Sequence, residues 1–371
     1  MTPGFVFKLR PTGPWRIGPD DGDRRKADLV YHSDALYSAV TGAMLEFGLL
    51  DAWLDATARA SDGSAVRFSS CFPWIGRTKL VSPPKHIWPA VPSPKMRWKG
   101  ARYIPLALVA DLLAGKTPDD NRWAVDGPGG CLLPAGSPSN PFRLDVRSSA
   151  AVDRLGAGVA GHSAACVEFS ANAGLWGAVA FAGPDAADAW SGPVKGAIRL
   201  LADSGFGGGR SRGWGRSESP EFRDGFLPGL ILRSSEASPA PPEDAMVEPQ
   251  PGSASEENLP QESEQDFPTQ GDVSRAETVH WLLSLFTPGA ADEVDWGRGS
   301  YTVVTRAGRV ESRVRSGDEK RLLNMVEEGS VLVARERLQG AAVDVAPGGF
   351  PHPVYRFGCA LSIRVPGQVR S

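Results

Sequence analysis

Gly205-Phe206-Gly207-Gly208-Gly209-Arg210-Ser211-Arg212-Gly213-Trp214-Gly215-Arg216 is the stretch on which the interpretation of the whole chain depends. Six glycines, three arginines and two aromatic residues share these twelve positions. Glycine permits positive φ and lets a backbone approach a ligand closely. Arginine adds a planar, permanently charged group that matches phosphate. The composition therefore predicts a loop that contacts an anion, although it also fits a glycine-rich turn packed under a helix.

The elements around this loop exclude two kinds of nucleotide site. Residues 185–204 have the apolar spacing of a helix, and residues 226–232 are predicted to form a closing strand. A phosphate-binding P-loop runs from strand to helix and ends in Gly-Lys-Ser/Thr. Here the order is helix, loop, strand, and the loop contains no such tripeptide. The GxGxxG spacing of dinucleotide sites is also absent. A cradle for a phosphodiester chain is the remaining prediction.

The preceding residues predict a β-α-β-β-α-β order. Residues 5–10 and 65–74 have strand composition, and a helix is expected to follow an N-cap at Ser33 or Asp34. Residues 106–113 predict a short helix and residues 117–140 a loop. Strands at 167–169 and 177–181 follow a hairpin-like insertion at 143–165, whose glycine-rich loop contains His162. The predicted class is α+β, with a ferredoxin-like (RRM-like) domain over residues 1–233.

A second domain is predicted after an acidic linker. Residues 234–272 contain ten acidic residues and no Lys or Arg, a composition that cannot bury enough apolar surface to fold. Without this linker the formal charge changes from -3 to +7, which suits a polyanionic partner. Strands are expected in residues 273–371, a mostly β, degenerate ferredoxin-like domain. The expected strands are 278–286, 300–305, 309–314, 330–334 and 354–365.

Composition excludes several other classes. The first residues form no apolar segment of the kind found in signal peptides, and no apolar run reaches bilayer length. The four cysteines have no CxxC spacing and no histidine at ligand spacing. This pattern predicts a cytoplasmic protein without a zinc site or another cofactor, and without a membrane partner.

Residues 76–103 predict a second basic surface. The segment holds seven basic residues and no acidic one, with two tryptophans and Tyr103 between them, and its five prolines argue against a regular element. Basic and aromatic residues on an extended segment are typical of single-strand nucleic-acid surfaces. The same composition also fits a solvated loop whose tryptophans cover the edge of the core.

Several short motifs, in sequence order, resemble one family. His32 to Ala39 is similar to an HSDxLxSA segment, and the glycine-rich loop follows the second helix as in the RAMP (repeat-associated mysterious protein) superfamily of CRISPR systems. Within it, the chain resembles the fourth Csm subunit, which caps the 5′ end of the guide RNA in type III-A interference complexes. Further matches are Arg147…Val152-Asp153-Arg154, Gly174-Leu175-Trp176, Glu327-Glu328-Gly329-Ser330 and Val354-Tyr355-Arg356-Phe357-Gly358.

The resemblance implies a non-catalytic RNA-binding subunit in antiviral defence. Such subunits hold the repeat-derived 5′ handle of the guide (crRNA) between the large polymerase/cyclase-like subunit and the first backbone subunit of the filament. The insertion at 143–165 then resembles a thumb that crosses the guide. The residues expected to contact RNA are His32, Ser33, Lys85, Arg97, Arg147, Arg154, His162, Gly207, Gly208, Gly209, Arg210, Ser211, Arg212, Trp214 and Arg216.

The principal alternative is catalytic. Other RAMP proteins are metal-independent ribonucleases that process precursor guide RNA with a histidine. His32 and His162 are the candidates in the first domain, although a capped helix start and a glycine-rich loop are poor places for catalysis. Asp34 is interpreted as a helix cap, Asp153 as a hairpin ion pair, and Glu327 with Glu328 as solvated charge. A protein adaptor without RNA contact is the third possibility.

Overall fold

The computed structural model describes residues 1–18, 25–88, 98, 100–127, 129–137, 140–152, 158–232, 277–312 and 314–366. The described residues before position 233 and after position 276 together form one compact unit. The predicted linker, Arg97, Asp153 and Arg154 therefore lie outside the described residues. Within the described ranges, no helix combines the length and apolar character that crossing a membrane requires.

The first sheet is built from strands that are far apart in the chain. Its order is β11-β1-β10-β3-β4-β5, and β2 also pairs with β10. The pairs β11–β1, β1–β10 and β10–β3 are all antiparallel. The strands are β1 (Thr2–Leu9), β2 (Val66–Phe68), β3 (Phe72–Ile75), β4 (Thr78–Val81), β5 (Ile104–Pro105), β10 (Ala173–Phe181) and β11 (Glu221–Leu227).

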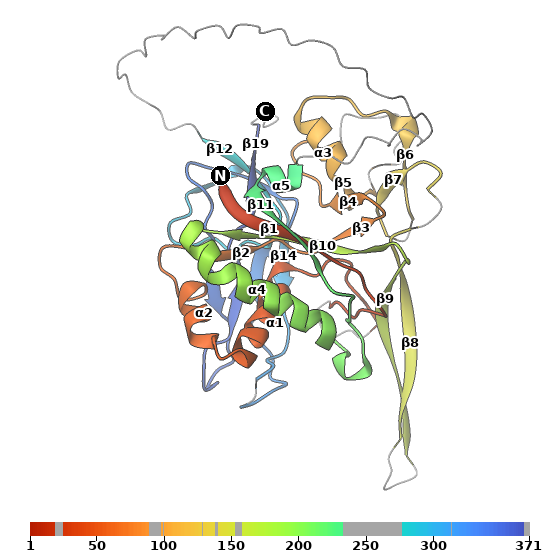
Figure 1. Ribbon diagram of the computed structural model, residues 1–371, viewed down its shortest axis with the longest axis vertical. Coiled ribbons are helices and arrows are strands. Elements are labelled where there is room, and N and C mark those ends of the chain that lie inside the picture. The colour runs from red at the N-terminus through yellow and green to blue at the C-terminus, as the bar shows by residue number, and fades with distance from the viewer. Residues whose placement is uncertain are drawn as a thin grey trace, which may run out of the picture. The chain divides into compact units, whose positions relative to one another are not determined.

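Helices cover one face of this sheet. Figure 1 shows α1, α2 and α4 together on one side of β1 and β10. Because side chains alternate along a strand, Phe5 and Phe7 of β1 pack into the helix-side core, while Val6 packs into the core on the opposite face. The helices are α1 (Ser33–Glu46), α2 (Leu50–Ala56), α3 (Leu106–Leu113), α4 (Pro184–Ser204), α5 (Gly229–Leu232) and two short 3-10 turns, η2 (Asp120–Arg122) and η3 (Arg210–Arg212).

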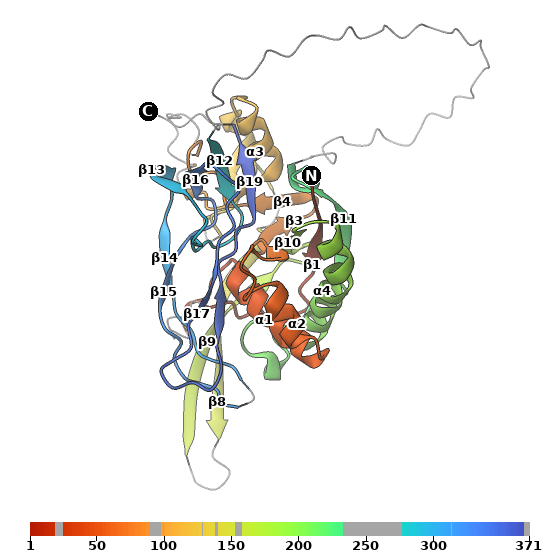
Figure 2. The same ribbon diagram turned by 90° about the vertical axis from the view of Figure 1, so that its left-hand side faces the viewer.

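The second large sheet covers the other face. Its order is β13-β16-β12-β19, with every neighbouring pair antiparallel. Trp281 of β12 and Ile363 of β19 share a core cluster with Val6 and Ala178 of the first sheet. Figure 2 shows this sheet and the helix α4 on opposite sides of β1. The C-terminal strands are β12 (Thr278–Leu282), β13 (Val294–Ser300), β14 (Val303–Arg306), β15 (Leu323–Val326), β16 (Val331–Ala334), β17 (Ala342–Asp344), β18 (Tyr355–Phe357) and β19 (Ser362–Val365).

A long hairpin extends away from the sheets in both views (Figures 1 and 2). It consists of β8 (Phe142–Val152) and β9 (Val159–Phe169), paired antiparallel from Phe142 opposite Phe169 to Val152 opposite Val159. The predicted insertion is thus confirmed as a hairpin. His162, however, was wrongly expected in a loop: it lies on β9 opposite Ser149.

Several predicted elements are wrong in type or extent. Residues 226–232 do not form a strand, because β11 ends at Leu227, Pro228 provides no amide hydrogen to continue a ladder, and α5 follows. The predicted loop at 117–140 contains the hairpin of β6 (Trp123–Val125) and β7 (Leu132–Pro134). The segment at 309–314 has only an isolated bridge at Arg309 among its described residues. The basic segment does contain a strand, β4, which precedes its first proline.

Candidate nucleic-acid interface

The β8–β9 hairpin has one strongly polar face. Side chains alternate along each strand, so Arg143, Arg147 and Ser149 of β8 share a face with His162 and Glu168 of β9. Arg143 donates to Glu168 at 2.9 Å, and Arg147 pairs with both Glu168 and Asp145. These hydrogen bonds from the two guanidinium groups keep the pKa of Glu168 below its ordinary value. The carboxylate therefore fixes the arginines at the base of the hairpin.

The glycine-arginine loop reaches this face of the hairpin. The guanidinium of Arg212 donates to the Ser149 hydroxyl at 3.1 Å and to His162 Nε2 at 2.6 Å. Ser149 Oγ also lies 2.9 Å from His162 Nε2. Since arginine can only donate, His162 Nε2 is the acceptor, and the ring carries its proton on Nδ1. Ser149, His162 and Arg212 thus meet at one place, although they lie 13 to 63 residues apart in the sequence.

An open cavity of about 370 Å³ lies where the loop meets the hairpin. Its lining combines the cations Arg147 and Arg212, the residues Ser148 and Ser149, and the half-buried ring of Trp214. Trp214 packs partly against the loop itself, because a Cβ on Gly209 would lie 3.0 Å from its ring. The remaining ring surface faces the cavity. Cations beside an aromatic ring form the kind of surface that binds single-stranded nucleic acid.

At least two glycines of the loop are required by the backbone conformation of the loop itself. Gly207 has φ of 69°, and a Cβ there would lie 2.3 Å from the carbonyl oxygen of Arg16. Gly215 has φ of 81°, and a Cβ there would lie 2.0 Å from the carbonyl oxygen of Phe206. Both positions need glycine, because Gly207 lies against the backbone at Arg16 and Gly215 lies where the loop folds back on itself at Phe206. The sequence signal for an anion cradle is thus carried by the arginines rather than by these glycines.

The four arginines at this surface differ in their partners. Arg210 pairs with Glu311, and Arg147 pairs with Glu168. Within the part of the chain that the structure describes, the exposed Arg212 and Arg216 have no acidic partner. Ser211 is exposed beside them. Among the described residues, no carboxylate of the protein therefore competes with a phosphate for Arg212 or Arg216.

The basic segment at 76–103 is largely held by the protein. Lys85 donates to Thr302 at 2.6 Å and to Glu327 at 3.0 Å. Trp88 stacks on the buried Trp98 at 5.9 Å between ring centroids, and Tyr103 is fully buried. The described aromatic residues of this segment thus cover the core, as the second interpretation of its composition held.

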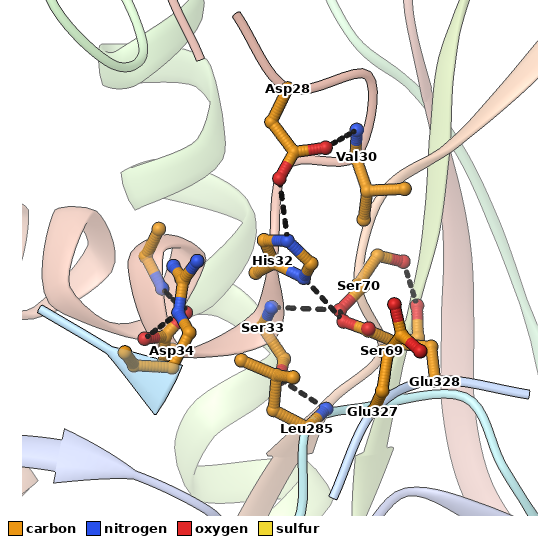
Figure 3. A network of polar contacts seen from close by, with 12 residues as sticks. Asp28, Val30, His32, Ser33, Asp34, Ser69, Ser70, Leu285, Glu327 and Glu328 are labelled. Carbon is orange, nitrogen blue, oxygen red and sulfur yellow. Dashed lines mark hydrogen bonds and ion pairs between the residues drawn. The ribbon is translucent and has the colours of Figure 1, made fainter. Parts of the chain in front are cut away.

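His32 and Ser33 lie in a buried polar network (Figure 3), away from the hairpin cavity's lining. His32 contacts Asp28 at 3.0 Å and Glu328 at 2.8 Å. Ser33 Oγ accepts from the Leu285 amide at 3.0 Å. Glu328 also accepts from Ser70 and is only 4% exposed, so its interpretation as solvated charge was wrong. These residues join the N-terminal and C-terminal parts of the compact unit.

Asp34 is the second link between the two parts. The structure assigns the N-cap position to His32 without a side-chain cap, so the prediction of a cap at Ser33 or Asp34 was wrong. Asp34 instead accepts from Arg306 at 3.1 and 3.0 Å and pairs with Arg356. Burial alone would raise the pKa of this carboxyl, but the two guanidinium groups hold the pKa well below its usual range.

The His32 network predicts a specific pH dependence of stability. Burial alone would lower the pKa of His32, but Glu328 and Asp28 outweigh it and raise the pKa from 6.5 to about 10. The folded protein thus binds this proton more tightly than the unfolded chain. The resulting stabilisation is complete below pH 6.5 and is lost as the pH rises to about 10. Each unit of raised pKa corresponds to about 1.4 kcal/mol.

Urea unfolding between pH 6 and 10 measures this effect. The unfolding free energy of the wild type is expected to fall by several kcal/mol more over this range than that of His32→Gln. His352→Gln is the matched control, because His352 is exposed and lies in no comparable network. Parallel curves for wild type and His32→Gln would show that His32 is not a buried cation.

One group of side chains has the composition of a metal site. Ligand atoms of Asp145, Cys166 and Glu168 lie within 4.8 Å of one another. Both carboxylates are already paired with arginines, and burial raises the pKa of the Cys166 thiol, which disfavours the thiolate that a metal needs. The arrangement is better explained as the ion-pair network of the hairpin base.

Ser149, Arg306 and Arg356 are functional or structural partners that sequence reasoning did not identify. Ser149 carries no signal, since isolated serines are common on strands. Arg356 and Glu328 lie within motifs shared with the family, but their partners in α1 are distant in sequence. Only the fold brings these positions together.

Comparison with known proteins agrees with the motifs. Residues 276–365 match the family model of the CRISPR Csm4 C-terminal domain. The chain also resembles solved chains from two crystal structures, each covering 98% of both chains. One is a Csm3–Csm4 subcomplex of the type III-A CRISPR-Cas interference complex (14% identity, TM-score 0.56), and the other is a Csm1–Csm4 cassette with pppApA (17% identity, TM-score 0.52). No curated protein sequence matches the chain.

The fold is therefore similar to that of these chains from type III-A CRISPR complexes, with α and β elements and mostly sheets. Residues 276–365 match the Csm4 C-terminal domain, and the resemblance to this family that the sequence motifs indicate is confirmed.

Proposed function

We propose that the chain is a non-catalytic RNA-binding subunit of a type III-A CRISPR interference complex, and that it holds the 5′ handle of the guide RNA. The observation that carries this proposal is the meeting of Arg147, Ser149, His162, Arg212 and Trp214 at the hairpin base. Guanidinium groups and hydroxyls suit phosphates, and the exposed part of an indole ring suits a base.

The proposed RNA surface contains fewer residues than the sequence predicts. It comprises the hairpin face and residues 205–216, with Arg216 as a further phosphate contact. His32, Ser33 and Lys85 are left out because the protein itself holds their side chains. Gly207, Gly208 and Gly209 shape the loop, and Arg210 can join the surface only by leaving Glu311. Arg97 and Arg154 lie outside the described residues.

We further propose that the subunit bridges two protein partners in the cytoplasm. The similar solved chains come from complexes that contain Csm1 in one case and Csm3 in the other. A large polymerase/cyclase-like subunit and a backbone subunit of the filament are accordingly the proposed partners. The fold leaves the outer strands β13 and β19 of the second sheet as edges that could pair with another chain.

We propose two ferredoxin-like domains, at residues 1–233 and 273–371, joined by the acidic linker 234–272. The order β11-β1-β10-β3 places the fourth, first, third and second strands of a β-α-β-β-α-β unit side by side. The order β19-β12-β16-β13 repeats this arrangement, and loops or short strands replace the helices within its described residues. The second unit is thus a degenerate copy of the first.

The rival function, cleavage of precursor guide RNA, rests on His162 beside Arg212 at the cavity. In the observed geometry His162 Nε2 accepts from Arg212 and so lacks the proton of a general acid. If Arg212 left His162 to bind a phosphate, Nε2 would be free to take up a proton. Cleavage of RNA must therefore be tested directly.

The test uses the full chain with guide RNA in EDTA. We expect tighter binding of RNA carrying its repeat-derived 5′ handle than of RNA with a shuffled handle, and no cleavage. Equal affinity for the two RNAs would contradict handle recognition. Site-specific cleavage that His162→Ala abolishes would establish the rival instead.

A further inference from the structure

A second cavity of about 370 Å³ lies between the two large sheets, and none of its lining residues contributes to the hairpin cavity. Ala180 of β10 and Leu227 of β11 line it from the first sheet, and Ile363 of β19 lines it from the second. Most of the lining is apolar, but the polar groups include Arg337, Arg364 and His280. Its volume lies within the range of small-molecule sites.

The charged residues that line this cavity are both arginines. No carboxylate residue contributes to its described lining. Within the described residues, neither Arg337 nor Arg364 has an ion pair or a side-chain hydrogen bond. Burial and the nearby charge of Arg364 lower the pKa of Arg337. The half-buried Arg337 and the exposed Arg364 thus lie close enough for their charges to repel, and an anion placed between them would relieve this repulsion.

Arg67 adds a third cation behind the wall. It lies on β2 directly opposite Ala180, so both side chains point to the same face of the sheet. Arg67 is only 4% exposed, and its Nε has no partner in the described structure. Burial, together with Arg337, lowers the pKa of Arg67 to about 10. A buried cation that is not fully paired strengthens the positive potential of the cavity.

His280 forms a neutral polar part of the lining. Thr278 Oγ1 donates to the Ala334 carbonyl, so it accepts from His280 Nε2 at 2.7 Å. His280 Nδ1 then accepts from Ser362 Oγ at 3.3 Å. Burial and the charges of Arg364 and Arg337 lower the pKa of His280 to about 4, while Asp292 and the Glu336 backbone act in the opposite direction. The imidazole is therefore uncharged at neutral pH.

We propose that this cavity binds a nucleoside monophosphate, with its phosphate on Arg337 and Arg364 and its base against Leu227, Pro228 and Ile363. Guanidinium groups are the preferred partners of phosphate, and apolar walls accept a flat ring. Thr2 and Ser362 line the same cavity and provide hydroxyls for the ribose. A single-stranded RNA would need a longer basic path, and a folded protein partner would need a larger surface.

Binding has a specific spectroscopic signature. A phosphate beside Arg337 and Arg364 offsets the positive charge that disfavours protonated His280. The pKa of His280 should therefore rise from about 4 toward its ordinary value of 6.5 when the site is filled. The chain has five histidines, so the His280 ring signal can be assigned by its loss in His280→Gln.

The experiment titrates the full chain with AMP, GMP, CMP and UMP, and with adenosine and inorganic phosphate separately. We expect at least one nucleotide to bind and to raise the His280 pKa, and adenosine and phosphate to bind at least tenfold more weakly. Arg364→Ala should weaken nucleotide binding about tenfold or more at an unchanged melting temperature. Arg335→Ala is the matched control, because Arg335 lies two residues from Arg337 but faces Glu293 at 3.8 Å.

Three results would overturn the proposal. They are no binding of any of the four nucleotides, nucleotide binding that leaves His280 unchanged, and equal losses in Arg364→Ala and Arg335→Ala. Binding of inorganic phosphate as tightly as nucleotide would show a simple anion site and would refute the nucleoside part. Displacement of bound nucleotide by a partner subunit's acidic peptide, with tighter binding of the peptide, would assign the cavity to a protein contact instead.

Discussion

Asp34→Asn is expected to lower the free energy of unfolding by about 3–5 kcal/mol, the largest stability effect of any single substitution considered. The Asp34 side chain is 2% exposed and pairs with Arg306 and Arg356, which are 10% and 5% exposed. Removing the carboxylate charge would leave two guanidinium groups buried without their counter-ion. Because α1 carries Asp34 and the C-terminal part carries both arginines, the loss would separate the two parts of the compact unit.

Urea unfolding monitored by tryptophan fluorescence measures this loss. Asp55→Asn is the matched control, because Asp55 of α2 forms an exposed pair with Arg59 that contributes little to stability. The triple change of Asp34, Arg306 and Arg356 to apolar residues of similar size should recover much of the stability, since it leaves no charge unpaired. Equal losses in Asp34→Asn and Asp55→Asn would refute the role of Asp34 as a buried link.

The sequence predicts the local elements of the first half well, because they have strong local signals. The predicted helix at 106–113 coincides with α3, and the helix at 185–204 coincides with α4 to within one residue. Their apolar spacing and their flanking glycine and proline residues define them without tertiary information. The hairpin was likewise predicted from two strand-like runs around a glycine-rich segment, although its strands reach further into that segment than expected.

The second half was harder to predict, since its strands are three to seven residues long and their partners lie far apart. Residues 354–365 were expected to form one strand, but β18 pairs with β17 and β19 pairs with β12. Short strands have too few positions to show alternation, so tertiary pairing decides their limits. The strands β15 and β17 were missed for the same reason.

The sequence predicts which charged residues belong to the candidate site, but it does not predict how they are arranged in space. Arg212 and His162 were both named from the sequence, yet their contact with each other and with Ser149 depends on how the loop folds against the hairpin. The shared motif at His32 to Asp34 was interpreted as a cap or an RNA contact. In the structure it contacts Glu328, Arg306 and Arg356, because burial turns polar residues into partners for one another.

Loss of the arginines in the proposed RNA surface is expected to have the second large effect. The double variant Arg212→Ala/Arg216→Ala should bind handle RNA about 100-fold more weakly at low salt, since each charge-assisted hydrogen bond to phosphate contributes about 1.5 kcal/mol or more. These two side chains are exposed and have no acidic partner among the described residues, so their removal leaves no buried charge behind. The melting temperature should therefore stay close to that of the wild type.

Removing Arg210 as well should cause only a small further loss of RNA affinity. Its pairing with Glu311 must be broken before it can bind phosphate, so part of its contact energy is offset. Arg59→Ala is the matched control for the loss of one positive charge, because Arg59 lies beyond α2 and pairs with Asp55 at 2.9 Å. It should leave RNA affinity unchanged within about twofold.

The salt dependence of handle-RNA binding by Arg212→Ala/Arg216→Ala tests the central claim most directly. Each phosphate contact to single-stranded RNA contributes about 0.7 to the slope of log affinity against log salt concentration. We predict that the slope of the double variant is shallower than that of the wild type by about 1.4, while Arg59→Ala keeps the wild-type slope. A double variant with the slope and affinity of the wild type would contradict the assignment of this surface to the guide RNA.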